Sequence, residues 1–303
     1  MNYEIVHRTV YEYSSEVSVS QHVVHLTPRT LPGQQCLRHE LTIDPVPALV
    51  TRRDDYFGNP TASFTMASAH RTLVVTARSE VAVHSRHWPA AGETPAWERA
   101  RCNSNRPVSI PFDAQEYTFP SAFVPALHAL ETYARPSFPA GRPLLEAVIE
   151  LTHRIHTDFT FDPKATTVAT PLEQVIAQRR GVCQDFAHLQ IGCLRALGVP
   201  ARYVSGYLET VPPPGETKLV GSDASHAWVQ VFVPDNGWID VDPTNNVLPS
   251  DRHIVAAWGR DFDDVSPVRG VISGGGKHTL TVAVDVIPRP ALGGTSRPPF
   301  GAN

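Results

Sequence analysis

Apolar and polar positions alternate through much of the first 85 residues, as they do in β-strands. Leu37, Leu41 and Ile43 alternate with more polar neighbours, and residues 73–83 are rich in β-branched side chains. Turn-forming sequences separate these segments, namely Leu31-Pro32-Gly33, Asp44-Pro45 and Phe57-Gly58-Asn59-Pro60. The pattern predicts an N-terminal antiparallel β domain over residues 1–85.

Residues 86–142 lose this periodicity, and prolines recur through them. One short helix is predicted near residues 125–133. Because long structureless stretches are uncommon inside compact domains, we expect part of this Pro-rich connection to be ordered against a neighbour.

Helical spacing of apolar residues returns at residue 143 and opens a second domain, expected over residues 143–287. Apolar spacing and helix-ending residues predict helices over 143–157, 171–180 and from 183 to about 197. Strands are predicted at 201–208, 226–233, 238–242 and 278–286. Residues 211–218 and 265–276 are expected to be loops, and the Pro/Gly-rich residues 288–303 a disordered tail. The fold class predicted for the whole chain is therefore α+β.

Composition and charge narrow the classes of function. The 303 residues are 42% hydrophobic and 18% charged, with a net charge of −4 and a pI near 6.4. This balance offers no basic surface for nucleic acid or for an anionic membrane. No apolar run approaches the roughly 20 residues of a membrane helix, and the N-terminus has no signal-peptide pattern, so we expect a cytoplasmic protein.

The four cysteines are sparse and form no Cys-x-x-Cys pair, which argues against a disulfide framework and a zinc cluster. Cys183 differs from the others because it opens an apolar helix. A thiol there faces the positive end of the helix dipole and free backbone N–H groups, which favour the nucleophilic thiolate. The alternative is a buried structural thiol, and that is our interpretation of Cys193, which lies within an apolar helical stripe.

A base for Cys183 has to come from elsewhere in the fold. His188 lies five residues further along the same helix and on a different face, so it is a poor candidate. His226 opens an alternating strand after a loop, a position typical of a cleft edge. His153 and His156 share a predicted helix, but no third metal ligand follows at a known spacing, so we predict no metal site.

The residue that would orient His226 is left open by the spacing. Asp240, Asp242 and Asn245 all lie on or just after the strand that follows. Tight turns place Asp242 three to five residues away from contact with His226, and only a longer or bulged connection pairs the two. A four-residue loop would set Asn245 opposite His226 instead.

Four blocks resemble the bacterial transglutaminase-like superfamily. In order, they are Arg180-Gly181-Val182-Cys183-Gln184-Asp185-Phe186, Arg202-Tyr203-Val204-Ser205-Gly206-Tyr207, His226-Ala227-Trp228-Val229 and Gly237-Trp238-Ile239-Asp240-Val241-Asp242-Pro243-Thr244. Leu26-Thr27-Pro28-Arg29, Phe57-Gly58-Asn59 and the segment 259–265 resemble the branch that has an N-terminal β domain. The resemblance covers most of residues 3–287 and implies a papain-like core with a catalytic triad of Cys183, His226 and Asp242.

The resemblance also implies the chemistry, which is acyl transfer from amides through a thioester on Cys183, without cofactor or metal. Peptide or protein substrates are expected, and hydrolysis is the preferred outcome because no amine-binding motif is recognisable. Protein-glutamine γ-glutamyl transfer is the alternative, and a non-catalytic binding module comes from a different class of function. The sequence does not define the oligomeric state.

Overall fold

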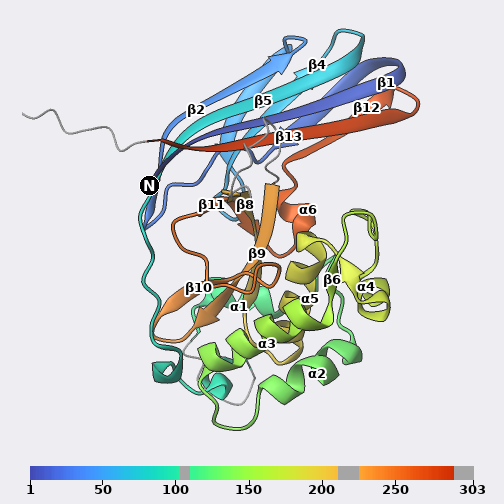
Figure 1. Cartoon of the computed structure of the whole chain (residues 1–303). Helices are drawn as coiled ribbons and strands as arrows, with labels where there is room; N and C mark the ends of the chain where they lie inside the picture. The colour runs from blue at the N-terminus through green and yellow to red at the C-terminus, as the bar shows by residue number, and fades with distance from the viewer. Residues whose placement is uncertain (103–109, 211–224, 290–303) are drawn as a thin grey trace, which may run out of the picture.

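The computed structural model describes residues 1–102, 110–210 and 225–289. Figure 1 shows a large sheet lying above a second domain of strands and helices. This arrangement confirms the predicted α+β class with an N-terminal antiparallel sheet. The predicted loop at 211–218 lies outside the described residues, as does the predicted tail from residue 290 onward.

The first sheet is built around one long strand, β1 (Asn2–Val24), whose alternating burial matches the alternating sequence. The sheet has the order β2-β5-β1-β4-β3, and β12 and β13 pair with β1 as well; all these pairings are antiparallel. The other strands are β2 (Gln34–Asp44), β3 (Leu49–Asp54), β4 (Pro60–Met66), β5 (His70–Val83), β12 (Val268–Gly274) and β13 (His278–Arg289).

The C-terminal part of this sheet corrects two predictions. Residues 268–274, expected to be a loop, form β12, which pairs with residues 17–24 of β1. This strand is glycine-containing and largely exposed, so it lacks an apolar alternation that would reveal it. Because β12 and β13 belong to the first sheet, the second domain does not extend to residue 287 as expected. Pro288 and Arg289, placed in the tail, belong to β13.

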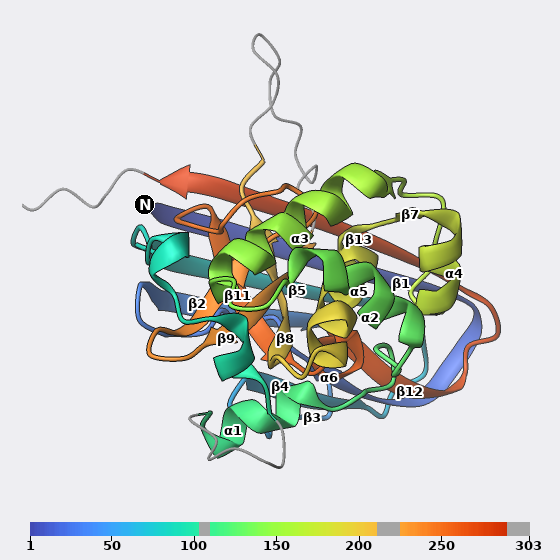
Figure 2. The ribbon, with the colours of Figure 1, turned by 90° about the horizontal axis from the view of Figure 1, so that it is seen from below.

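The second domain has a four-stranded antiparallel sheet in the order β10-β9-β8-β11. Its strands are β8 (Ala201–Leu208), β9 (Ser225–Val233), β10 (Gly237–Val241) and β11 (His253–Gly259). Figure 2 shows the helices covering the side away from the first sheet. They are α2 (His128–Ala134), α3 (Leu144–Asp158), α4 (Leu172–Gln178) and α5 (Cys183–Ala196), and a parallel pair, β6 (Thr160–Phe161) and β7 (Arg180–Gly181), lies next to α4.

The connection between the domains is ordered where it is described, as expected. Trp97 is buried and its indole Nε1 donates to the carbonyl of Pro139 at 2.9 Å. This region and the link after β11 also contain several short helical turns. They are the 3-10 turns Ala91–Glu93, Trp97–Ala100, Glu116–Thr118 and Arg135–Ser137, with α1 (Phe112–Gln115) and α6 (Phe262–Val265).

The two domains share a buried apolar layer. Tyr3 and Ile5 of β1 and Val284 of β13 pack in one cluster with Tyr207 of β8 and Ile254 of β11. Since Tyr207 pairs with Ser225 at the start of β9, this layer lies beside the first residues of β9. The N-terminal sheet therefore packs directly against the strand ends on which the candidate site is built.

Candidate active site

Cys183 is the first residue of α5, as the sequence predicts. The helix start is fixed by Asp185, whose carboxylate accepts hydrogen bonds from the Val182 N–H at 2.8 Å and from the Thr166 hydroxyl at 2.7 Å. A Cβ at position 181 would lie 2.6 Å from Asp185 Oδ2, which explains why glycine stands there. The thiol is thereby held at the positive end of the helix dipole.

His226 and Asp242 form a buried pair. His226 Nε2 lies 2.8 Å from Asp242 Oδ2, and the two side chains are 9% and 0% exposed. An ionised carboxylate can only accept hydrogen bonds, so His226 Nε2 is the donor. The other ring nitrogen, Nδ1, takes no part in the bond with Asp242.

Asp242 accepts five hydrogen bonds. His226, His253 (3.0 Å) and the Asn245 amide (2.7 Å) donate to Oδ2, and the backbone N–H groups of Thr244 and Asn245 donate to Oδ1 at 2.9 and 3.1 Å. Burial alone would raise the pKa of Asp242, but the donors His226 and His253 outweigh it and hold this pKa well below its ordinary value. Asp242 is therefore a carboxylate at neutral pH.

The pKa of His226 shifts the other way. Burial lowers it, but side-chain hydrogen bonds with Asp242 and with Cys183 raise it to about 10. Cys183 and His226 are thus within interaction distance, although they come from separate segments of the chain. The arrangement favours a protonated imidazole at neutral pH.

The register between β9 and β10 differs from the registers that the loop lengths considered in the sequence analysis would give. A three-residue connection pairs Val241 with Val229, and continuing this register sets Asp242 level with Trp228. His226 lies two residues away on the same face of β9, which is a diagonal neighbour. The expectation that only direct pairing lets Asp242 contact His226 is wrong, because diagonal side chains on neighbouring strands can reach each other. The chain also turns at Asp242, which forms an isolated β-bridge with Val247.

The two alternatives to Asp242 have other roles. Asp240 accepts from Trp228 Nε1 at 2.7 Å and Gln230 Nε2 at 2.9 Å and forms a buried ion pair with Arg86. Asn245 donates to Asp242, and its Nδ2 lies 3.3 Å from His226 Nε2, so it lines the pair without replacing the carboxylate.

The remaining candidates lie away from this group. His188 is buried and accepts from the Phe262 N–H at 3.2 Å, and burial lowers its pKa to about 3. Cys193 is fully buried, and burial raises the pKa of its thiol. His153 and His156 point to different partners, Asn246 and the Thr244 carbonyl. None of these residues joins the His226–Asp242 pair.

His253 was not found by sequence reasoning. It opens β11, and the apolar run Ile254-Val255-Ala256-Ala257-Trp258 after it could have revealed that strand. Its position on the Asp242 carboxylate follows only from the packing of the strands.

Comparisons with known proteins show the family of this chain. Residues 3–82 match the bacterial transglutaminase-like N-terminal region, and residues 132–243 match the transglutaminase-like superfamily. A protein of unassigned function from Mycobacterium tuberculosis is 42% identical over 295 residues, covering 94% of this chain and 92% of that relative. A protein-glutamine gamma-glutamyltransferase of Pseudomonas aeruginosa is 32% identical over 126 residues, covering 41% of this chain and 19% of that enzyme.

Among solved structures, one from Cytophaga hutchinsonii, whose description as a cysteine protease is provisional, shares the fold. It has a TM-score of 0.73 and 20% identity, and the match covers 96% of this chain and 92% of that one. Both matched regions and the relative that spans nearly the whole chain lead to the same assignment. The chain belongs to the transglutaminase-like superfamily and carries the bacterial transglutaminase-like N-terminal region ahead of its core.

Proposed function

We propose that this protein is a cysteine-dependent acyl-transfer enzyme with Cys183 as nucleophile, His226 as general base and acid, and Asp242 as orienting carboxylate. The observation that carries the proposal is the buried His226–Asp242 hydrogen bond at 2.8 Å, together with the interaction of the same imidazole with the thiol of Cys183 at the start of α5. This order of groups is what nucleophilic catalysis by a thiol requires.

In the proposed reaction, the Cys183 thiolate attacks an amide carbonyl carbon and the carbon–sulfur bond forms. The C–N bond then breaks, and His226 transfers its proton to the leaving amine. In the second half, His226 takes a proton from water or from a second amine, which attacks the thioester and releases the thiolate. The backbone N–H of Cys183 is one donor for the developing oxyanion.

Hydrolysis of a peptide or protein amide is the outcome we favour, because water needs no dedicated binding site. Protein-glutamine γ-glutamyl transfer is the second candidate, and the similarity to the Pseudomonas aeruginosa enzyme over 126 residues favours it. Incubation with a glutamine-containing peptide and a primary amine, followed by mass spectrometry, separates the two. Amine incorporation without hydrolysis would make γ-glutamyl transfer the favoured function and hydrolysis the second candidate.

Site-resolved labelling with iodoacetamide at pH 6 tests the proposal itself. Cys183 should react much faster than Cys36 and Cys102, which are only partly buried, and His226→Ala should remove that advantage. Equal, slow labelling of these three cysteines would favour a non-catalytic binding module.

The cytoplasmic location remains a prediction. No helix of the described residues is long and apolar enough to cross a membrane.

A further inference from the structure

A second imidazole lies on the carboxylate that holds His226. We propose that His253 is a positioning residue, which fixes Asp242 for the reaction, and that the N-terminal sheet in turn fixes His253 through β11. The inference rests on the proposed function, because it assigns a task to residues around that site.

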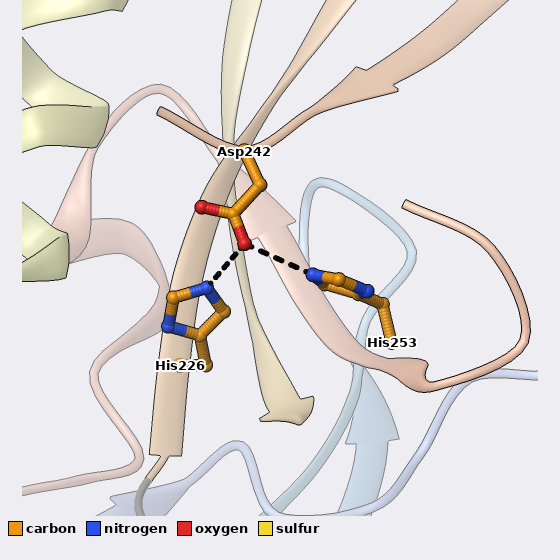
Figure 3. Close-up of side chains that lie close together, drawn as sticks. All are labelled: His226, Asp242 and His253. Carbon is orange, nitrogen blue, oxygen red and sulfur yellow. Dashed lines mark hydrogen bonds and ion pairs between the residues drawn. The ribbon is translucent and has the colours of Figure 1, made fainter. Parts of the chain in front are cut away.

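Figure 3 shows His226 and His253 approaching the same oxygen of Asp242 from two sides. The Nε2–Oδ2 distances are 2.8 and 3.0 Å, and since the ionised carboxylate only accepts, both rings donate. Trp228 lies against both rings, stacked on His226 with centroids 6.0 Å apart and edge-on to His253 at 5.2 Å. The carboxylate is therefore clamped between two oriented N–H donors.

The same three residues are types that bind metal ions, and their ligand atoms lie within 4.8 Å of one another. Hydrogen bonding accounts for the geometry better. Both Nε2 atoms point at one carboxylate oxygen at 2.8 and 3.0 Å, and that oxygen also accepts from Asn245. A zinc ligand set would direct its lone pairs at a common point about 2 Å from each atom, instead of at one of the ligands.

β11, which carries His253, is the edge strand of the four-stranded sheet as far as the chain is described. On its free side, side chains of the N-terminal domain take the place of a neighbouring strand. The Gln34 amide donates to the Val255 carbonyl and accepts from the Val255 N–H, both at 2.8 Å. The Asn59 amide does the same for Trp258, at 2.8 and 2.9 Å.

These two side chains are among the most buried polar groups of the N-terminal domain, at 2% and 0% exposure. Each one uses both its N–H and its C=O group on a single residue of β11, as a paired strand would. Arg29 adds a third contact, stacking its guanidinium on Trp258 at 3.5 Å. Through these contacts, the N-terminal domain sets the position of the strand from which His253 reaches Asp242.

The test compares the rate constant for iodoacetamide labelling of Cys183 at pH 6 in four variants of the full chain. His253→Leu removes the N–H donor and should slow labelling at least about tenfold, the effect of losing a hydrogen bond to a charged group. His253→Gln keeps an N–H within reach of Oδ2 and should recover most of the rate. Gln34→Glu, which cannot donate to the Val255 carbonyl, should slow labelling about threefold, whereas Gln35→Glu, on the exposed side of the same strand, should match the wild type.

Labelling of His253→Leu at the wild-type rate would overturn the inference, and so would a failure of His253→Gln to rescue a slowed site. If the leucine variant does not fold, NMR of the wild type can show which ring nitrogen of His253 carries a proton. The inference expects a proton on Nε2 of His253, and a bare Nε2 would overturn it. A wild-type Cys183 no faster than Cys36 would instead refute the proposed function, while the NMR measurement would still test the hydrogen bond.

Discussion

Gly206 offers a sharp test of how tightly the strands around the site are packed. It lies in β8, opposite His226 of β9 on one side and Val255 of β11 on the other. A Cβ at this position would stand 2.1 Å from the Ile254 carbonyl oxygen and 2.6 Å from the Trp228 ring. Both obstacles are buried, and the first is backbone, so Gly206→Ala forces a shift of β11 or β8.

The cost can be worked out from these contacts. Ordinary contact with a Cβ begins near 3.4 Å, so the Ile254 carbonyl has to move by more than 1 Å. Overpacking of this kind costs about 1–3 kcal/mol, and replacing glycine in a strand returns about 0.5–1 kcal/mol. Since neither neighbour is a flexible side-chain end, we place the overpacking cost at the upper end and expect a net loss of about 2 kcal/mol, or roughly 30-fold in the unfolding equilibrium.

Urea unfolding followed by tryptophan fluorescence measures this loss. Gly92→Ala is the matched control, because the added Cβ meets only Glu146 Oε1, the end of a half-exposed side chain that can turn away. We expect the control to stay within about 0.5 kcal/mol of the wild type. If Gly206→Ala also stayed within about 0.5 kcal/mol of the wild type, the close approach of β8, β11 and Trp228 would not be a rigid constraint.

Three further predictions concern buried charge and the thiols. Arg86→Ala leaves Asp240 buried without its counter-ion and should lower the free energy of unfolding by about 3–5 kcal/mol. Arg135→Ala, which breaks an exposed pair with Glu131, should change it by less than about 0.5 kcal/mol, and urea unfolding of both compares them. The pKa of Asp242 in the folded protein lies below its unfolded value near 4. Ionised Asp242 therefore stabilises the fold above about pH 4, and this stabilisation is lost as the pH falls from there through the folded-state pKa. The stability difference between wild type and Asp242→Asn should therefore shrink on acidification, and unfolding curves at several pH values check this; a constant difference would contradict it. Cys193, whose thiol is fully buried with a raised pKa, should resist iodoacetamide in the folded protein and react once the protein is unfolded in urea, as mass spectrometry can follow; labelling in the folded state would contradict this assignment.

Local sequence signals were sufficient for the elements that carry the reacting groups. The strand predicted at 201–208 coincides with β8, and Cys183 and His226 lie at the starts of a helix and a strand as expected. These features depend on short-range patterns, namely apolar periodicity and the glycine and proline that end a segment. They could be predicted because each pattern lies within the element that it specifies.

The parts that could not be predicted depend on contacts between distant segments. β12 has few buried side chains and is a strand because β1, about 250 residues earlier, pairs with it. The β9–β10 register depends on a three-residue connection, residues 234–236, with positive φ at Asp235 (69°) and at Gly237 (80°), the first residue of β10. The sequence Asp235-Asn236-Gly237 indicates a turn but does not select the loop length, and the meeting of His253 with Asp242 has no signature in the local sequence.

The position of β13 has a consequence for how the chain acquires its structure during synthesis. Residues 2–13 of β1 pair with residues 278–289, so one edge of β1 lacks its partner until nearly all of the described chain has been translated. At about 5–20 residues per second, this interval lasts roughly 15–50 s. An unpaired strand edge is prone to pair with other chains. Nascent protein should therefore depend on chaperones more than its folded stability would suggest.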